Sequence, residues 1–414
     1  MHRWRHPVFP LMLLGLLGGC RSPGPASVAP RALIRPGLEV LITDSMHLVR
    51  GRRVGLVSNQ SGVDRQGVHA VDRLLGAGVR LTALFSPEHG FRGRAAPGEK
   101  IATTTDSATG LPIYSLYGST MAPSRAILDS LDVILVDLQD VGARYYTWLA
   151  TTIEVMQAAW LANKPVVVLD RPNPIGGKVE GVVLDPAYRS NIGKLRVPIR
   201  HGLTLGEQAL LARRELGIAT DVRVVPVAGW RREVLFDQTG LPFLPPSPNL
   251  RDLEGLFHYP GVCLFEGTAL SVGRGSDAPF HQIGAPWLDP VAVLARVHQH
   301  ELPGVRFEQV NFTPSLPGDG KYADTTLRGI RLHLTDPTRY DPVRTAVVLL
   351  TAVYQVHPGK IRFNTQSFDR LAGGPGLREA IEAGLSPERI AKGWTVDIEG
   401  FRERARPILI YSGN

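Results

Sequence analysis

Short apolar runs separated by helical stretches fill the first half of the chain, and this alternation limits the fold more than any other feature. The apolar runs are residues 54–57, 81–85, 131–138 and 165–169. They show no polar/apolar alternation, and residues 68–75 and 148–162 between them have apolar residues at helical spacing. Strands that are apolar on both faces and joined by helices indicate a parallel sheet covered on both sides. The sequence therefore predicts an α/β domain.

The same alternation continues beyond the fourth run. Residues 205–216 form a predicted helix, with Thr204 as its N-cap and Glu207 completing a capping box. This gives Glu207 a structural role. Residues 222–227 are the next predicted strand.

A proline-rich segment, Pro242–Asn249, ends the pattern because proline suits neither a helix interior nor a central strand. We place a domain boundary after it, with a first domain at residues 38–255 and a second at 256–414. Predicted strands of the second domain are 262–265 and 330–334, and predicted helices are 290–297, 343–357 and, with short breaks, 375–401. This mixed pattern indicates a smaller α+β domain.

The N-terminus has the features of an export signal. Two arginines precede an apolar stretch at residues 8–17, which is too short to span a bilayer, since a spanning helix needs about 20 residues. Leu-Gly-Gly directly before Cys20 resembles the signal of bacterial lipoproteins, in which this cysteine receives the lipid. We therefore interpret residues 1–20 as a lipoprotein signal peptide and residues 21–37 as a flexible tether. The expected location is the periplasm or cell envelope, anchored to a membrane; an ordinary signal peptide is the alternative.

Charge and cysteine content restrict the classes of partner. Lys and Arg number 46 against 38 Asp and Glu, a net charge of +8, but the basic residues are scattered along the chain. This argues against nucleic-acid binding and is compatible with an anionic glycan. Cys263 lies in an apolar run and is expected to be a buried thiol, so no disulfide is expected.

Polar residues gather immediately after the predicted strands. The four clusters are Asn59 and Gln60; Glu88, His89 and Arg92; Asp137, Gln139, Asp140, Arg144, Tyr145 and Tyr146; and Asp170, Arg171 and Asn173. In a parallel sheet these clusters converge on one edge, where open α/β sheets bind their ligands. The sequence therefore predicts an active-site cleft there, with Asp137 more suited to a buried structural role.

The sequence lacks the motifs of several common enzyme classes. The chain contains no G-x-G-x-x-G after the first strand, no P-loop, no H-E-x-x-H, no C-x-x-C and no G-x-S-x-G. Dinucleotide, nucleotide and zinc-protease chemistry are therefore disfavoured, and we expect neither a cofactor nor a metal. Carboxylate acid–base chemistry remains.

Glycoside cleavage fits such a site because one carboxylic acid protonates the leaving oxygen while a second group attacks or activates water. In 2-acetamido sugars, the substrate's own acetamido oxygen can replace the attacking carboxylate. Glu88 is the candidate acid, since the neighbouring Phe85 and Phe91 could raise its pKa. Asp140 is the candidate second carboxylate.

Long motifs carry a family resemblance. They are Ser86–Gly93 (SPEHGFRG), Asp137–Thr147 (DLQDVGARYYT), Asp170–Pro174 (DRPNP), Phe265–Thr268 (FEGT), Ser271–Gly275 (SVGRG) and Pro279–Phe280. In these motifs the chain resembles the bacterial exo-β-N-acetylmuramidase family from about residue 38 onward. The resemblance implies a Rossmann-like domain without a nucleotide, a smaller C-terminal domain, and an active site between them that releases N-acetylmuramic acid from non-reducing ends of peptidoglycan. It also implies that Glu88 is catalytic.

The resemblance gives further residues roles in substrate binding. N-acetylmuramic acid carries a lactyl carboxylate, which an arginine can bind through two hydrogen bonds. Arg274 is the first candidate for this role, and Arg144 and Arg171 are the next. The alternative role of Arg274 is an ion pair with Asp277 or Glu266. The other expected substrate-binding residues are His89, Arg92, Tyr145, Tyr146, Asn173, His201 and Glu266. His201 could equally be a residue that starts a helix.

Two other functions stay open at this stage. A lipoprotein could bind muropeptides or sugars without cleaving them. Esterase or deacetylase chemistry on cell-wall sugars would require an activated serine or a metal.

Overall fold

The computed structural model describes residues 1–4, 7–8, 33–93, 99, 102–118 and 120–413. Cys20, most of the predicted signal peptide and most of the predicted tether lie outside these residues. No helix in the described part of the chain is long and apolar enough to cross a membrane. Residues 33–414 form one compact unit.

A seven-stranded sheet forms the centre of the first domain. Its strands are β1 (Val54–Ser58), β2 (Leu81–Ser86), β3 (Thr104–Thr105), β4 (Pro112–Ser115), β5 (Val133–Asp137), β6 (Val166–Leu169) and β9 (Val222–Val225). Their order is β3-β4-β2-β1-β5-β6-β9, and every neighbouring pair is parallel except β3 and β4. Without β3, this is the 3-2-1-4-5-6 order of a doubly wound, Rossmann-like sheet. The predicted fold class is confirmed.

Helices cover both faces of this sheet, as the unalternating strands predict. They are α1 (Gly37–Asp44), α2 (Ala70–Gly76), α3 (Arg125–Asp129), α4 (Trp148–Leu161) and α5 (Leu205–Glu215). Side chains of α1 and α2 pack with one set of strand residues, including Leu56 and Leu135. Side chains of α3, α4 and α5 pack with the opposite set, including Val57 and Val136. The predicted capping box of Thr204 and Glu207 is present.

The second domain combines an antiparallel sheet with helices. Its elements are α6 (Leu253–Val262), β10 (Gln282–Ala285), α7 (Pro290–Val297), β11 (Val305–Phe312), β12 (Leu327–Leu334), α8 (Pro342–Val356), α9 (Thr365–Ala372), α10 (Gly376–Glu382), α11 (Pro387–Lys392) and α12 (Thr395–Ala405). The strand order is β10-β12-β11. The helix α8 is buried along most of its length, as expected for the apolar segment 343–357.

One predicted strand is wrong. Residues 262–265 complete α6 and begin a 3₁₀ helix, Cys263–Gly267. Asp252 caps α6 through a hydrogen bond from Gly255 N, and the helix is buried from Gly255 to Val262, so its C-terminal half has no solvent-exposed polar face. Periodicity cannot separate such a segment from a buried strand.

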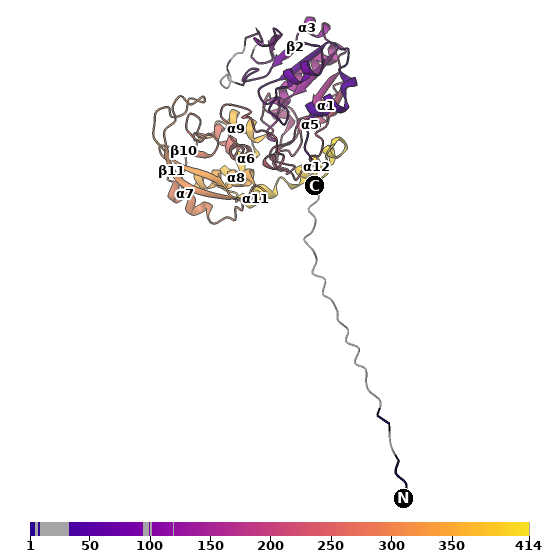
Figure 1. Ribbon diagram of the computed structural model, residues 1–414. Coiled ribbons are helices and arrows are strands. Elements are labelled where there is room, and N and C mark those ends of the chain that lie inside the picture. The colour runs from indigo at the N-terminus through magenta and orange to yellow at the C-terminus, as the bar shows by residue number, and fades with distance from the viewer. Residues whose placement is uncertain (5–6, 9–32, 94–98, 100–101, 119, 414) are drawn as a thin grey trace. The chain divides into compact units, whose positions relative to one another are not determined.

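The first and last described residues of the compact unit, around Ile34 and Tyr411, pack against the first domain. Ile34 is buried and Arg35 pairs with Ala228, so the predicted tether ends before residue 37. The helix α12 contacts β7 (Glu180–Val183), which pairs with β8 (Pro198–Arg200), and lies beside α5 (Figure 1). The hydroxyl of Tyr411 donates to Asp170 across 2.6 Å. The last residues of the chain thus join the first domain in space.

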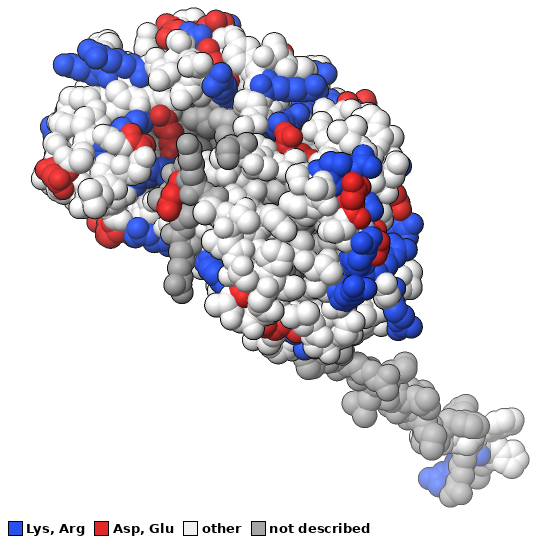
Figure 2. Space-filling view, turned by 90° about the horizontal axis from the view of Figure 1, so that it is seen from above, with Lys and Arg blue, Asp and Glu red and all other residues white. Residues whose placement is uncertain are grey.

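Charged side chains of both signs occur on the face of the molecule that Figure 2 shows. On the face shown in Figure 2, Lys and Arg side chains are interspersed with Asp and Glu. The net charge of +8 therefore does not gather into one basic patch on this face.

Candidate active site

A cavity of about 190 Å³ is lined by residues of both domains. The first domain contributes Glu88, His89, Tyr145, Tyr146, Thr147, Ile192, Ser247 and Leu250, and the second contributes Tyr259, Cys263, Glu266, Arg274, Phe280 and Leu371. Within the first group, Glu88 and His89 follow β2, and residues 145–147 follow β5; these two strands lie on either side of β1. The predicted convergence of strand-end residues at one sheet edge is thus observed for these two strands.

Glu88 is held at the cavity by groups from other loops. It follows β2, where Pro87 ends the strand, and the left-handed conformations of His89 (φ 68°) and Gly90 (φ 79°) turn the chain. Thr147 Oγ1 donates to Glu88 Oε2 across 2.9 Å. The hydroxyl of Tyr117 also lies close, and burial together with the Glu88 charge raises the pKa of Tyr117 to about 12. Tyr117 therefore stays protonated near neutral pH and can donate to this carboxylate.

The two other charged residues of the Glu88 loop differ in position. His89 lines the cavity, and its ring lies edge-on to Trp148 with centroids 6.2 Å apart. Arg92 does not line it, because its Nη2 pairs with Asp106 Oδ1 at 2.7 Å. Arg92 therefore stabilises the loop.

The second domain places an ion pair in the cavity. Arg274 Nε donates to Glu266 Oε1 across 2.5 Å, and the guanidinium lies 5.0 Å from the centroid of the Phe280 ring. Although burial opposes it, the Glu266 carboxylate holds the pKa of Arg274 above its usual value. Among the described residues, the terminal nitrogens of Arg274 make no hydrogen bond. The two terminal nitrogens of Arg274 are therefore available to a ligand. The ion pair with Glu266, which the sequence analysis gave as the alternative role of Arg274, is also present, but it uses only Nε.

The loop that carries Arg274 has a fixed shape. Gly273 and Gly275 both have φ of 77°, and a Cβ at these positions would approach Ala278 O to 2.7 Å and Ser315 O to 2.6 Å. Lys321 Nζ donates to the carbonyls of four residues in the preceding segment: Phe265 (3.4 Å), Glu266 (3.0 Å), Thr268 (2.8 Å) and Leu270 (2.9 Å). Lys321 thus anchors the backbone around Glu266.

Asp140 does not line the cavity. It is buried, where its Oδ2 accepts from Gly142 N at 3.0 Å and from Gln208 Nε2 at 3.2 Å. Burial raises its pKa to about 6. The carboxylate that shares the cavity with Glu88 is instead Glu266.

His201 lies beside Asp140, also outside the cavity lining. Its Nδ1 accepts from Leu203 N at 3.1 Å, and its Nε2 is 3.7 Å from Asp140 Oδ2. Because burial lowers its pKa to about 3, the ring is neutral. The ring thus holds the turn that leads to Thr204, the N-cap of α5, which agrees with a position at the entry to a helix, one of its two expected roles.

Three further expected ligands are buried in the scaffold. Arg144 donates to the carbonyls of Val182, Val197 and Leu371, which belong to both domains. Asn173 donates to Leu203 O and accepts from Ile175 N. Arg171 forms a two-bond ion pair with Asp137, at 2.6 and 2.9 Å, which confirms the structural role expected for Asp137.

The two tyrosines after β5 line the cavity and join the domains. The Tyr145 hydroxyl donates to the carbonyls of Tyr259 (3.2 Å) and Pro260. Tyr146 packs edge-on against Trp148 and Tyr259, and its buried hydroxyl has no hydrogen-bond partner among the described residues. A sugar hydroxyl is a suitable partner for such a group. Cys263 is a buried thiol, as predicted.

Sequence reasoning missed several residues of this site: Tyr117, Thr147, Tyr259, Phe280 and Lys321. Thr147 and Phe280 lie inside or beside the motifs above and could have been singled out for that reason. Lys321 and Tyr117 lie outside every motif, and only the folded chain brings them to the site.

Comparison with known proteins identifies the family. Residues 54–254 match the N-terminal domain of exo-beta-N-acetylmuramidase NamZ, and residues 257–411 match its C-terminal domain. Peptidoglycan beta-N-acetylmuramidase NamZ of Bacillus subtilis (strain 168) is 38% identical over 407 residues, which cover 97% of each chain. The chain belongs to the NamZ family. The resemblance seen in the sequence motifs is thereby confirmed.

Solved structures agree with the NamZ-family fold. A DUF1343 family protein from Bacteroides fragilis NCTC 9343 superposes with a TM-score of 0.84 at 32% identity, covering 92% of this chain and all of the other. A second DUF1343 protein of the same organism gives 0.76 at 32% identity, covering 92% of this chain and 99% of the other.

Proposed function

We propose that this chain is an exo-acting glycoside hydrolase that releases N-acetylmuramic acid from the non-reducing ends of peptidoglycan fragments. The observation that carries the proposal is one cavity in which the Glu88 carboxylate and the Glu266–Arg274 pair both lie. The 38% identical relative is named as a peptidoglycan beta-N-acetylmuramidase, which supports the same substrate.

Glu88 is the proposed general acid. Its protonated carboxyl gives a proton to the glycosidic oxygen as the bond to the anomeric carbon breaks. Thr147 holds one carboxyl oxygen, so the group is oriented before substrate binds. The anomeric carbon is then attacked by the substrate's own acetamido oxygen or by water, and water supplies the new hydroxyl of the product.

Arg274 is the proposed ligand for the lactyl carboxylate. Its terminal nitrogens can bind two carboxylate oxygens while Nε stays with Glu266. This contact would let the enzyme distinguish N-acetylmuramic acid from N-acetylglucosamine, which lacks the lactyl group. Tyr146 offers a hydroxyl to the sugar, and a cavity of about 190 Å³ suits one terminal sugar better than a continuous strand.

Incubation with muropeptide oligosaccharides tests the proposal. We expect N-acetylmuramic acid to accumulate in the chromatogram while the remaining fragment shortens from its non-reducing end. Tight binding with no released sugar after long incubation would instead support a non-catalytic sugar-binding lipoprotein.

The cellular location is a separate proposal that rests on the N-terminal sequence. Cys20 would carry the lipid and hold the enzyme at a membrane facing the cell wall. Cells expressing Cys20→Ser should release the protein from the membrane fraction. Unchanged membrane association of this variant would exclude lipid attachment at Cys20.

A further inference from the structure

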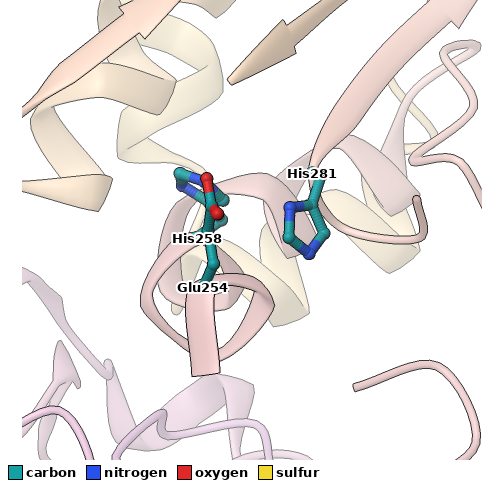
Figure 3. A group of neighbouring side chains, drawn as sticks. All are labelled: Glu254, His258 and His281. Atoms are coloured by element: carbon teal, nitrogen blue, oxygen red, sulfur yellow. The ribbon is translucent and has the colours of Figure 1, made fainter. Parts of the chain in front are cut away.

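Two histidines and a glutamate converge at the start of the second domain, away from the cavity lining. Glu254 and His258 project from α6, and His281 precedes β10 (Figure 3). One potential ligand atom from each residue lies within 4.8 Å of the other two. Glu254 and His258 are four residues apart, so they occupy the same face of the helix.

The central histidine has an unused nitrogen that faces this cluster. His258 is fully buried, and its Nε2 has no hydrogen-bond partner among the described residues. That nitrogen lies 3.5 Å from Glu254 Oε1. A buried polar atom without a partner costs free energy, so it calls for a ligand.

The outer contacts of the cluster are already in place. The Nδ1 of His258 lies 2.9 Å from the Tyr340 hydroxyl, and the Nε2 of His281 lies 3.0 Å from Asp252 Oδ1. Glu254 Oε1 accepts from Leu334 N at 2.7 Å. Histidines that bind metals use their second nitrogen in this way, which fixes the tautomer and the ring orientation.

We propose that Glu254, His258 and His281 bind a divalent transition-metal ion of the zinc type. Two imidazoles and one carboxylate are a set that Zn²⁺ accepts, with water completing the coordination. A hard ion such as Mg²⁺ is disfavoured because it prefers oxygen ligands.

The ion would fix two walls of the cavity. Tyr259 directly follows His258, and Phe280 directly precedes His281; both line the cavity. The rings of Tyr259 and Phe280 are in edge-on contact, with centroids 4.9 Å apart. A metal that joins α6 to the start of β10 would therefore hold these two rings in place against each other. The role is structural, and it stands whether or not the proposed glycosidase activity does.

Zinc binding by the full chain, purified without a histidine tag, tests this site. After chelator treatment and removal of the chelator, the protein is given Zn²⁺, desalted and analysed by mass spectrometry for metal content. His281→Ala and Glu254→Gln are the test variants, since both residues are partly exposed, whereas the fully buried His258 could affect folding. His333→Ala is the matched control, because His333 pairs with Glu308 at a more exposed position.

We expect one Zn²⁺ per chain and a higher melting temperature with Zn²⁺ for the wild type and for His333→Ala. Both test variants should bind Zn²⁺ at least roughly tenfold more weakly and lose the melting-temperature shift. A wild type that retains no Zn²⁺, or test variants that retain it with wild-type affinity, would overturn the proposal.

Discussion

The Thr147 hydroxyl donates a hydrogen bond to Glu88 Oε2 across 2.9 Å and so links the start of α4 to the loop after β2. Thr147 occupies the N-cap position of α4, yet its side chain makes no capping bond to that helix. Threonine at an N-cap usually bonds to a backbone N–H of the first turn. Here the hydroxyl serves the carboxylate instead, which gives this residue a positioning role.

Replacing Thr147 by valine should lower kcat/KM about tenfold while the fold is kept. Valine has nearly the same shape but cannot donate, and a hydrogen bond to a charged group contributes about 1.5–3 kcal/mol. Steady-state kinetics on a chromogenic β-N-acetylmuramide measure the change. Thr109→Val is the matched control, since Thr109 donates to Asp106 at 2.8 Å outside the cavity lining. Equal losses in both variants would contradict a role specific to Glu88.

Arg274→Gln should weaken the discrimination between muramic and glucosamine substrates. Loss of a charge-assisted contact to the lactyl carboxylate should reduce kcat/KM for the β-N-acetylmuramide by roughly 10–100-fold. The rate on the corresponding N-acetylglucosaminide, which has no lactyl group, should fall much less. Arg331→Gln removes a more exposed ion pair with Asp277 and serves as control. An equal loss on both substrates would mean that Arg274 only supports the loop.

The buried Asp140 should make stability depend on pH. Its pKa is raised from 3.8 to about 6, so the folded chain holds a proton that the unfolded chain releases. The favourable contribution of Asp140 to the free energy of unfolding is complete below pH 4 and is lost as pH rises through 6. The difference between these two limits is about 3 kcal/mol. Asp140→Asn does not titrate, so its stability relative to the wild type should increase between pH 4 and pH 7 in urea unfolding.

Asp132 provides a control of opposite sign for that experiment. Hydrogen bonds from Arg53 lower its pKa to about 2, so its contribution is present above pH 4 and lost as pH falls toward 2. Asp132→Asn should therefore be less stable than the wild type at pH 7. A constant difference between Asp140→Asn and the wild type from pH 4 to pH 7 would contradict the titration of Asp140.

Most of the central sheet could be predicted because five of its strands are recognisable by themselves, whereas β3 and β4 were not predicted. The segments around Leu56, Leu84, Leu135 and Val167 are unbroken apolar runs, which specify strands buried on both faces. The prediction of a strand at residues 262–265 was wrong because an apolar run of four residues also fits a buried helix.

The site was harder to predict because side-chain partners are chosen in three dimensions. Glu88, Glu266 and Arg274 were identified from their motifs and do line one cavity. Arg144 and Asn173 have the same polar chemistry, but the fold uses them to bond buried carbonyls. The Zn²⁺-type cluster was not foreseen, since Glu254 and His258 are 23 or more residues from His281 and only the packing of α6 beside β10 brings them together.

Hydrolysis of a chromogenic β-N-acetylmuramide by the wild type and by Glu88→Gln tests the central claim most directly. Glutamine keeps the size of the side chain but has no acidic proton to donate. General acid catalysis contributes about 10²–10⁴-fold, so we predict a loss of kcat of that size, with the melting temperature and KM largely retained. Wild-type kcat in Glu88→Gln would show that another group protonates the glycosidic oxygen.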